Sequence, residues 1–561
     1  MLNRLRGLIA DAAGWTDFQL GEPEFEKLGH FTTNAAFAVA KRDKTKSLEA
    51  AERLKTNIAA AAPKNFIEKI DVTPPGFLNF WMSQKALQQE FARIRRQGEK
   101  YGQLNIGKGG KAIVEYSSPN IAKPMHVGHL RSTIIGDSLA NIHKFLGYRV
   151  VRWNYLGDWG TQFGKLIAAY KLWGDKRELE RTPIETLLKL YVRFHEELKG
   201  NPDLERRGRE EFKKLEEGDR ENKRLWQWFR KESLKDFEGI YHALGVKFDV
   251  EIGESFYDKD LKPLVKYLGD KKILKVSEGA LIVPLDAFGL PPALLEKSDG
   301  ASLYLTREIA NLFYRLKRYH PKKILYVVGH EQTLHFEQLI AVAKLLKLSA
   351  TELMHVKYGM VTGEGGKKIS TREGSSIALE NLIFEALTRA RKVVDAKQPE
   401  LSEREKDKIS KLVGIAALKY NDLSQSRLSD ISFDWDKMLN FEGNSAPYLL
   451  YAYARLRSIL KKARLKKADP KFLTATNDLN LVLELSRFPE VMRKAGETCF
   501  PHYIAGYLYD LSRAVNRFYE TEPVLKADKG IREARLTLID TAATALKTGL
   551  NLLGIQTVEK M

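Results

Sequence analysis

The pattern of apolar and polar positions near the start of the chain predicts a small α/β domain over residues 1–105. Leucine and isoleucine recur in residues 2–9 at the spacing of an amphipathic helix, and a short apolar helix is expected after Asn34. The Pro-Pro-Gly at 74–76 separates two runs that are typical of strands. A helix rich in Gln and Arg then leads to the glycine-rich loop 105–111, where we expect the domain to end.

A second pattern starts at residue 106. Short apolar runs end in polar loops and alternate with helical segments, which is typical of parallel strands linked by helices; the runs are residues 112–116, 149–156, 323–329 and 354–361. Ligands of such a sheet bind at the carboxyl ends of its strands. We predict a Rossmann-like parallel-sheet domain over residues 106–395, with a mostly helical insertion over about 165–290. The dense charge of this insertion is typical of a solvated helical surface.

Beyond residue 395 the apolar positions recur at helical spacing, for example in KLVGIAALKY, PYLLYAYARLRSIL and ARLTLIDTAATALKTGLNLLGI. This pattern predicts an all-α domain of four to six helices over residues 396–561. The expected fold class is therefore an α/β Rossmann-like parallel-sheet domain with a helical insertion, preceded by a small α/β domain and followed by an all-α bundle.

Composition narrows the classes of protein further. With 561 residues, 43 % of them apolar, the chain is long enough for two to four domains with buried cores. Lys and Arg number 92 against 72 Asp and Glu, and the net charge of +20 suits a polyanionic partner, although a basic solvated surface gives the same balance. Cys499 is the only cysteine, which excludes an internal disulfide and a cysteine-based zinc site. We predict no protein-held metal.

The chain has no run of about 18 apolar residues, and the apolar stretch at its N-terminus is too short for a secretory signal. These features predict a cytoplasmic protein without a membrane span. Because nothing in the sequence indicates a dimer interface, a monomer is expected.

The strongest chemical signal is His126-Val127-Gly128-His129, which follows the strand at 112–116 and begins a helix. A helix N-terminus offers free N–H groups and partial positive charge to a phosphate. The two imidazoles can donate hydrogen bonds to phosphate oxygens as charge develops there, and the glycine lets a nucleobase approach the backbone. Two histidines that only satisfy the start of a helix would leave the same tetrapeptide, and this alternative stays open.

Longer segments carry a resemblance to a known family. VEYSSPNIAKPMHVGHLRST (114–133) resembles the first signature of class I aminoacyl-tRNA synthetases, in the form used by arginyl-tRNA synthetases. PPGFLNF and the residues around Asn34 resemble the extra N-terminal domain of that family, which binds tRNA. Other similar segments follow in the family's order: WNYLGDWGTQFG, VGHEQTLHFEQL, KYGMVTGEGGKKISTREG, FEGNSAPYLLYAYARLRSI and REARLTLIDTAATALKTGLNLLGI. The resemblance covers nearly the whole chain.

The resemblance implies an arginine-tRNA ligase. Such an enzyme activates L-arginine with ATP, accompanied by Mg²⁺, to arginyl-adenylate and transfers the arginine to the terminal ribose of tRNA(Arg). The helical C-terminal domain would then bind the anticodon. Three alternatives stay open: another class I synthetase, a small nucleotidyltransferase with the same histidine motif, and a tRNA-binding relative that has lost catalysis.

The resemblance also implies a site for arginine, formed by Glu115, Ser118, Asn120, Tyr304, Glu308 and Gln332. The first three would hold its α-amino and carboxylate groups, Tyr304 and Glu308 would hold its guanidinium, and Gln332 would complete the pocket. A guanidinium is a planar fork of donors that suits carboxylate and phenol acceptors in a desolvated pocket. The family has Asp where this chain has Glu308. An exposed helix carboxylate paired with Arg307 or Arg315 is the alternative for Glu308.

The residues implied in ATP binding are His126, Gly128, His129, Lys368 and Ser370, and those implied in catalysis are His126, His129, Lys123, Lys368 and Arg372. The segment 368–372 would be the second ATP signature, but Thr371 stands where class I enzymes commonly have a second lysine. Lys123 or Arg372 could supply the missing cation. A solvated turn on a flexible glycine-rich hinge is the alternative for this segment.

The residues implied in tRNA binding are Asn34, Tyr451, Tyr453 and Arg455. Unstacked loop bases favour aromatic and guanidinium platforms, although the spacing of the two tyrosines is equally compatible with a helical core. The segment 455–471 carries eight cations and one acid, which favours contact with phosphates or, alternatively, a solvated helix face.

Overall fold

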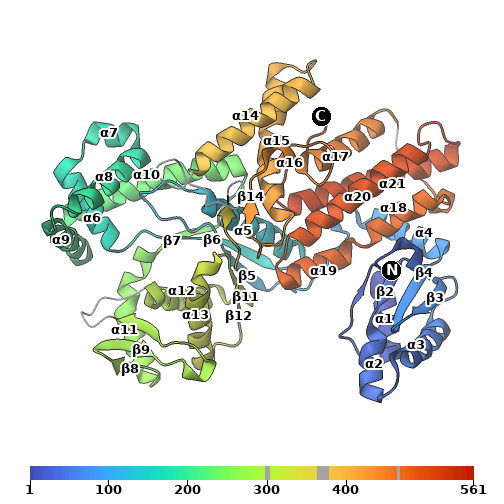
Figure 1. Ribbon diagram of the computed structural model, residues 1–561, viewed down its shortest axis with the longest axis horizontal. Coiled ribbons are helices and arrows are strands. Elements are labelled where there is room, and N and C mark those ends of the chain that lie inside the picture. Colours follow the sequence, from blue (N-terminus) through green and yellow to red (C-terminus); the bar gives the residue numbers. More distant parts are fainter. Residues whose placement is uncertain (297–303, 363–377, 464–467) are drawn as a thin grey trace.

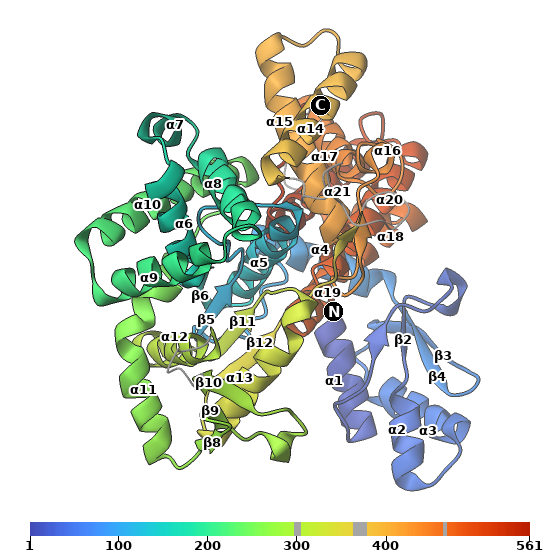
Figure 2. The same cartoon turned by 60° about the vertical axis from the view of Figure 1, so that its left-hand side comes forward.

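The computed structural model describes residues 1–296, 304–362, 378–463 and 468–561. They form a central α/β domain, a helical domain beside it, and a small N-terminal domain that packs against the helical domain (Figures 1 and 2). Within the described residues, no helix is long and apolar enough to cross a membrane.

The N-terminal domain packs helices against an antiparallel sheet of order β1-β2-β4-β3. The apolar positions at 2–9 face this core, with Leu2, Leu5 and Ile9 buried. Asn34 precedes the second helix, and its Oδ1 accepts a hydrogen bond from the backbone N–H of Gln19 (2.8 Å). The elements are α1 (Leu2–Ala13), β1 (Leu20–Gly21), β2 (Phe31–Thr33), α2 (Ala35–Asp43), α3 (Ser47–Ala61), β3 (Ile67–Thr73), β4 (Phe77–Met82) and α4 (Gln84–Gln97).

The central domain is built on a five-stranded parallel sheet of order β12-β11-β5-β6-β7. The chain leaves the middle strand β5 toward β6 on one side and returns to β11 on the other, so the order reverses between β5 and β11. Such a switch point leaves a crevice at the carboxyl ends of the two strands. The strands and their covering helices are β5 (Lys111–Glu115), α5 (Val127–Phe145), β6 (Arg149–Leu156), β7 (Val250–Gly253), α12 (Tyr304–Tyr319), β11 (Lys323–Tyr326), α13 (Thr333–Leu345) and β12 (Glu352–His355).

The expected helical insertion contains more than helices. Its helices are α6 (Thr161–Trp173), α7 (Lys176–Arg181), α8 (Pro183–Leu198), α9 (Asp203–Glu217), α10 (Arg220–Leu244) and α11 (Asp258–Asp270). Between α10 and α11 the chain returns to the sheet as β7, which sequence reasoning missed because this edge strand has only four residues and includes the exposed Glu251. A small antiparallel sheet follows, formed by β8 (Lys275–Ser277), β9 (Ala280–Val283) and β10 (Ala293–Glu296).

The single strand predicted at 354–361 is also wrong. The structure ends β12 at His355 and, after a connection of five residues, starts a separate strand β13 (Val361–Thr362), which pairs in parallel with β14 (Ile431–Ser432). An apolar run therefore passes from one sheet to another, and periodicity alone does not separate the two strands.

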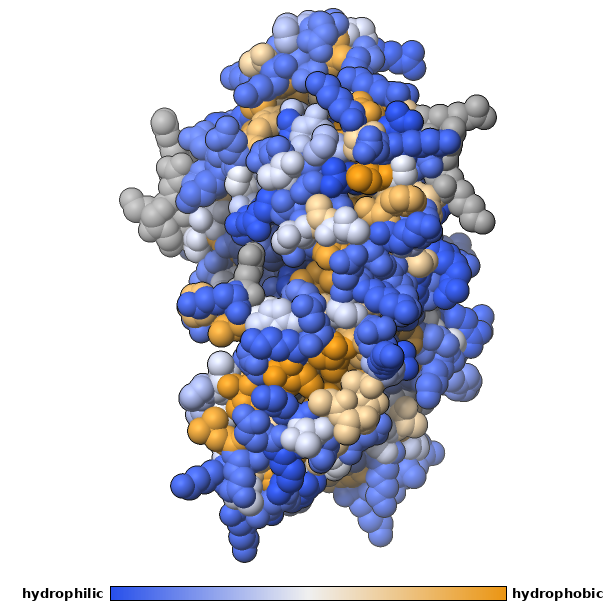
Figure 3. All heavy atoms as spheres, turned by 90° about the vertical axis from the view of Figure 1, so that its right-hand side faces the viewer, coloured by the Kyte–Doolittle hydropathy of each residue, from blue (hydrophilic) through white to orange (hydrophobic). Residues whose placement is uncertain are grey.

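The C-terminal domain packs its helices around one core, and its face in Figure 3 is mainly hydrophilic with scattered hydrophobic clusters. Among the described residues after 395 there are six longer helices and the single turn α16, in line with the predicted helical bundle. The helices are α14 (Leu379–Lys397), which links the two domains, and α15 (Glu403–Leu423), α16 (Trp435–Met438), α17 (Ala446–Lys461), α18 (Thr476–Ser486), α19 (Phe488–Thr498), α20 (His502–Thr521) and α21 (Lys529–Leu552). Cys499 is buried, as expected of a small apolar side chain.

Candidate active site

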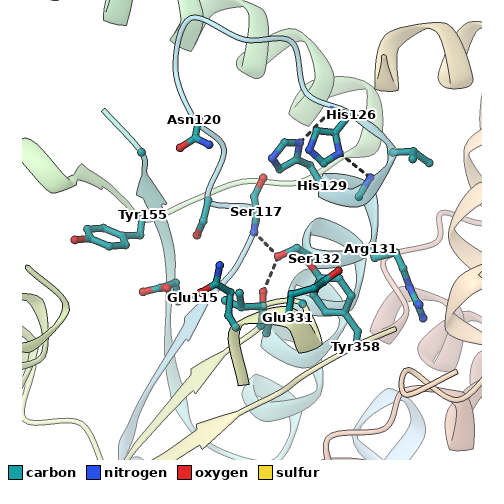
Figure 4. A pocket seen from close by; sticks show the side chains of 18 of the residues that line it. Glu115, Ser117, Asn120, His126, His129, Arg131, Ser132, Tyr155, Glu331 and Tyr358 are labelled. Atoms are coloured by element: carbon teal, nitrogen blue, oxygen red, sulfur yellow. Dashed lines mark hydrogen bonds between the residues drawn. The ribbon is translucent and has the colours of Figure 1, made fainter. Parts of the chain in front are cut away.

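A pocket of about 690 Å³ opens at the switch point, where β5 and β11 end and α5 begins (Figure 4). Ser132, on the second turn of α5, fixes the two strand ends. The backbone N–H of Ser117 donates to its Oγ (2.9 Å), and the same Oγ donates to the backbone oxygen of Val327 (2.7 Å). The two strand ends that border the crevice are thus bonded to the same hydroxyl group, on the helix that follows β5.

The loop after β5 passes close to the end of β6. The backbone N–H of Ile121 donates to the oxygen of Gly157 (3.1 Å), and the N–H of Gly157 donates to the oxygen of Pro119 (3.1 Å). A Cβ atom at position 157 would lie 1.8 Å from Oδ1 of Asn120. Glycine is therefore needed in the segment WNYLGDWG so that the Asn120 side chain can lie against this strand end, beside the pocket that it lines.

The two histidines of the tetrapeptide form the start of α5. The backbone N–H of Gly128 donates to Nδ1 of His126 (3.1 Å), and the backbone N–H of His126 donates to Nδ1 of His129 (3.0 Å). Burial lowers the pKa of both rings, that of His129 to about 3 with a further contribution from His126, so both are neutral at pH 7. A neutral ring that accepts at Nδ1 carries its proton on Nε2. The helix start therefore has two Nε2–H donors beside the pocket, in addition to its own N–H groups.

The other end of the pocket is acidic. Glu115, at the end of β5, and Glu254, directly after β7, both line it. Glu308 lies beneath them on α12, is 1 % exposed, and neither of its carboxylate oxygens has a hydrogen-bond partner among the described residues. Burial raises the pKa of Glu254 to about 7, and burial together with the charge of Glu115 raises that of Glu308 well above its ordinary value. This group of carboxyl side chains suits a bound cation that donates several hydrogen bonds.

The structure brings together eight of the predicted site residues in this pocket: Glu115, Ser118, Asn120, His126, Gly128, His129, Tyr304 and Gln332. Glu308 does not line the pocket but lies close enough to Glu115 for the charge of Glu115 to raise its pKa. The alternative of an exposed Glu308 paired with Arg307 or Arg315 is wrong, because the carboxylate is buried and Arg315 bonds to Glu115 instead.

The predicted cations are placed differently. Lys123 does not line the pocket; its Nζ lies 4.3 Å from the centre of the Tyr191 ring on α8. Lys368, Ser370 and Arg372 lie outside the described residues.

The predicted tRNA-binding residues divide into two groups. Tyr451 is 38 % exposed, and the guanidinium of Arg455 lies 5.4 Å from its ring and 5.0 Å from the ring of Tyr519. Tyr453 is 2 % exposed, and its hydroxyl donates to Oε1 of Glu559 (2.7 Å). The structure thus favours the packing alternative for Tyr453 and leaves Tyr451 and Arg455 as a surface platform.

Sequence reasoning missed several residues that line the pocket, among them Glu254, Tyr155, Arg131 and Tyr358. Glu254 could have been found, because it directly follows a strand of the sheet in the segment IGESFYD, as Glu115 ends another; the failure to identify β7 hid it. Arg131 carried no such signal, since its partners Asp422 and Gly359 are more than 200 positions away.

The parallel sheet, the switch-point pocket and the histidines at the start of α5 together define the catalytic domain of a class I aminoacyl-tRNA synthetase. Consistent with this, residues 90–435 match the family model described as "tRNA synthetases class I (R), catalytic domain". Residues 3–82 match "Arginyl tRNA synthetase N terminal domain", and residues 449–561 match "DALR anticodon binding domain".

Whole-chain comparisons agree with these matches. The chain is 43 % identical over 502 residues to an arginine-tRNA ligase of Halothermothrix orenii, covering 89 % of this chain and 88 % of the relative. It is 42 % identical over 546 residues to one of Streptococcus suis, covering 97 % and 95 %. The arginyl-tRNA synthetase of Thermus thermophilus superposes with a TM-score of 0.86 at 27 % identity, covering all of both chains. The chain belongs to the arginyl-tRNA synthetase family.

Proposed function

We propose that this chain is an arginine-tRNA ligase, which activates L-arginine with ATP and transfers it to tRNA(Arg). The observation that carries the proposal is the buried Glu308 carboxylate without a hydrogen-bond partner among the described residues, at the opposite end of the pocket from the two histidines. A guanidinium supplies the donors that this end lacks, and analogues without those donors would leave its acceptors unpaired. The identity to arginine-tRNA ligases over most of the chain supports the same substrate.

In the proposed first step, a carboxylate oxygen of arginine attacks the α-phosphorus of ATP in line. The bond from that phosphorus to the bridging oxygen breaks, and arginyl-adenylate and pyrophosphate are the products. The Nε2–H groups of His126 and His129 would donate to the phosphate oxygens as negative charge develops on them. No side chain becomes covalently modified, so the protein contributes position and electrostatic stabilisation.

In the proposed second step, the 2′-hydroxyl of the terminal ribose of tRNA attacks the activated carbonyl carbon, loses its proton and displaces AMP. Lys123, Lys368, Ser370 and Arg372 are proposed to contribute to the phosphate site. Mg²⁺ is proposed to accompany ATP and would help to neutralise the charge of its phosphates. Among the residues that the structure describes, no group of three or more His, Cys, Asp or Glu side chains could hold a metal ion.

The net charge of +20 supports tRNA as the partner, because it favours association with a polyanion. We propose that the helical domain binds the anticodon through Tyr451 and Arg455, and that the N-terminal domain contacts tRNA near Asn34. We further propose that the enzyme acts in the cytoplasm as a monomer.

Pyrophosphate exchange with each of the twenty amino acids, with and without tRNA, tests the proposal. Of the twenty amino acids, only arginine is expected to support exchange. Exchange with another amino acid would contradict the assigned substrate. Binding of tRNA without exchange for any amino acid would identify a relative that has lost catalysis.

A further inference from the structure

A stripe of polar side chains runs along one side of α12. Tyr304, Glu308, Asn311 and Arg315 are separated by four, three and four residues, which places them on the same side of the helix. The last three are buried, and the Tyr257 hydroxyl donates to Oδ1 of Asn311 (2.8 Å). A guanidinium of the protein itself therefore lies on the same helix face as the carboxylate that we propose binds the guanidinium of the ligand.

Arg315 is held at the inner end of this stripe. Its Nη2 donates to Oε2 of Glu115, and both side chains are at most 3 % exposed. The guanidinium also lies 4.4 Å from the centre of the Trp153 ring and 5.5 Å from that of Tyr326. Burial alone would lower the pKa of Arg315, but the Glu115 carboxylate and other neighbouring acidic groups raise it, so Arg315 is a permanent cation.

Glu308 lies within reach of that cation. Arg315 follows Glu308 by seven positions, which corresponds to about 10 Å along the helix axis, and helical side chains lean toward the N-terminus, so a released Arg315 would extend toward Glu308. The two charges already interact, because Arg315 partly offsets the rise in the pKa of Glu308 that burial and Glu115 cause. With no hydrogen-bond partner among the described residues, the Glu308 carboxylate would accept this guanidinium as readily as that of a ligand.

We infer that Glu115 acts as a positioning residue, which holds Arg315 away from Glu308 and so keeps the Glu308 carboxylate open for the guanidinium of the ligand. This inference rests on the proposed function. It also explains how a buried cation can lie beside a pocket for a cation: the Glu115–Arg315 pair is neutral as a unit, which leaves the Glu308 carboxyl group without a hydrogen-bond partner among the described residues.

A double-mutant cycle tests the inference, with the KM of arginine and kcat measured by pyrophosphate exchange in the presence of tRNA. Glu115→Gln frees Arg315 to pair with Glu308, and we expect the KM of arginine to rise about 100-fold. Arg315→Met removes the competing guanidinium but leaves Glu115 unpaired, and a rise of about tenfold is expected. The double variant Glu115→Gln/Arg315→Met should have a clearly lower KM of arginine than Glu115→Gln, because Glu308 is open again, although the loss of Glu115 from the pocket keeps it above that of the wild type.

Arg315→Lys is the conservative control. It keeps a cation beside Glu115, so the KM of arginine should stay within about fivefold of the wild type. The KM of ATP and the midpoint of thermal unfolding show whether a variant is damaged as a whole, and Arg315→Lys with Arg315→Met still decides the matter if Glu115→Gln does not fold.

Two results would overturn the inference: a double variant no better than Glu115→Gln, or a lysine variant as weak as the methionine variant. In an enzyme whose wild type is specific for arginine, these results would leave the proposed function intact. Exchange by the wild type with another amino acid would instead overturn both.

Discussion

Three carboxyl groups share the amino-acid end of the pocket, and two of them have a raised pKa. That of Glu254 is about 7 because of burial, and that of Glu308 is raised well above its ordinary value by burial and by the charge of Glu115. Glu254 is therefore partly protonated near neutral pH, and the shift of Glu308 favours its protonated form. A guanidinium stabilises the ionised carboxylate, so its binding must expel protons from these groups.

We predict that arginine binding releases roughly one proton or more at pH 7 and tightens as the pH rises from about 6 to 8. Calorimetric titrations in buffers of different ionisation enthalpy measure this release directly. Glu254→Gln should reduce the number of protons released. Citrulline, whose side chain is uncharged, should release none. Heats of arginine binding that do not depend on the buffer would contradict the pKa shifts of both groups.

At the phosphate end, the hydrogen bonds of His129 separate its structural role from its chemical one. Nδ1 accepts from the backbone N–H of His126 and Nε2–H is available to phosphate. His129→Asn keeps an acceptor near the position of Nδ1 but has no donor at the position of Nε2. We expect kcat to fall by about 10²–10³-fold, since one transition-state donor is lost.

His129→Gln is the matched control, because it places an amide donor near the position of Nε2. Its kcat should exceed that of His129→Asn. Equal loss in both variants, accompanied by a lower midpoint of thermal unfolding, would support the alternative in which the histidines only satisfy the helix start.

The histidine end of the site was predictable from sequence and much of the acidic end was not. His126 and His129 lie three positions apart, and short spacing at a helix start is visible in the sequence. The Glu115–Arg315 pair joins residues 200 positions apart, and its meaning depends on which strand lies beside which helix. Lys123, a cation next to the motif in sequence, lies over the Tyr191 ring in space and does not line the pocket, a placement that the sequence does not indicate.

At the scale of elements, the connection between β12 and β13 is fastened by the buried Arg131. Arg131 of α5 bonds Asp422 of α15 through Nε (2.9 Å) and Nη2 (3.1 Å), and its Nη1 donates to the backbone oxygens of Gly359 (2.8 Å) and Ser429 (2.9 Å). The backbone N–H of Met360 donates to Oδ1 of Asp430 (2.7 Å). The helix that carries the histidines is thereby tied to the helical domain and to the connection between β12 and β13.

Arg131→Met is expected to lower the free energy of unfolding by about 3–5 kcal/mol, because it leaves the buried Asp422 carboxylate uncompensated. Chemical denaturation followed by circular dichroism measures the change. Arg206, whose ion pairs on α9 are exposed, is the control, and Arg206→Met should leave the unfolding midpoint where it is. An Arg131 variant as stable as this control would show that the pair is not what joins α5 to α15.

Elements were predictable where their periodicity was long and uniform. The strand at 149–156 has the predicted bounds, and the helices after 395 follow the predicted pattern. Prediction failed for β7 and for the run 354–361, because a four-residue edge strand and a break between two strands within one apolar run leave no local signal. In both cases the arrangement is decided by pairing with distant strands, β6 for the first and β14 for the second.

For the whole molecule, the sequence order of the three domains was evident but their packing was not. The N-terminal domain packs on the helical domain through a shared apolar core and through polar contacts. Arg6 pairs with Glu490 (2.9 Å), Gln88 donates to the oxygen of Leu473 (2.9 Å), and Tyr101 donates to that of Ser486 (3.2 Å). Such contacts leave no pattern in the sequence. They place the two domains proposed to bind tRNA on one side of the molecule, which Figure 3 faces.

The surface platform of Tyr451 and Arg455 on the helical domain is proposed to bind a base of tRNA. Arg455 lies between the exposed rings of Tyr451 and Tyr519. An unpaired base of tRNA can stack on such an arrangement. Tyr451→Ala should raise the KM of tRNA about 5- to 100-fold and leave that of arginine unchanged, since base stacking contributes about 1–3 kcal/mol. Tyr453→Phe is the control, because that ring is buried and its hydroxyl bonds Glu559; it should affect stability alone. If Tyr453→Phe weakens tRNA binding as much as Tyr451→Ala does, the anticodon is bound elsewhere on this domain.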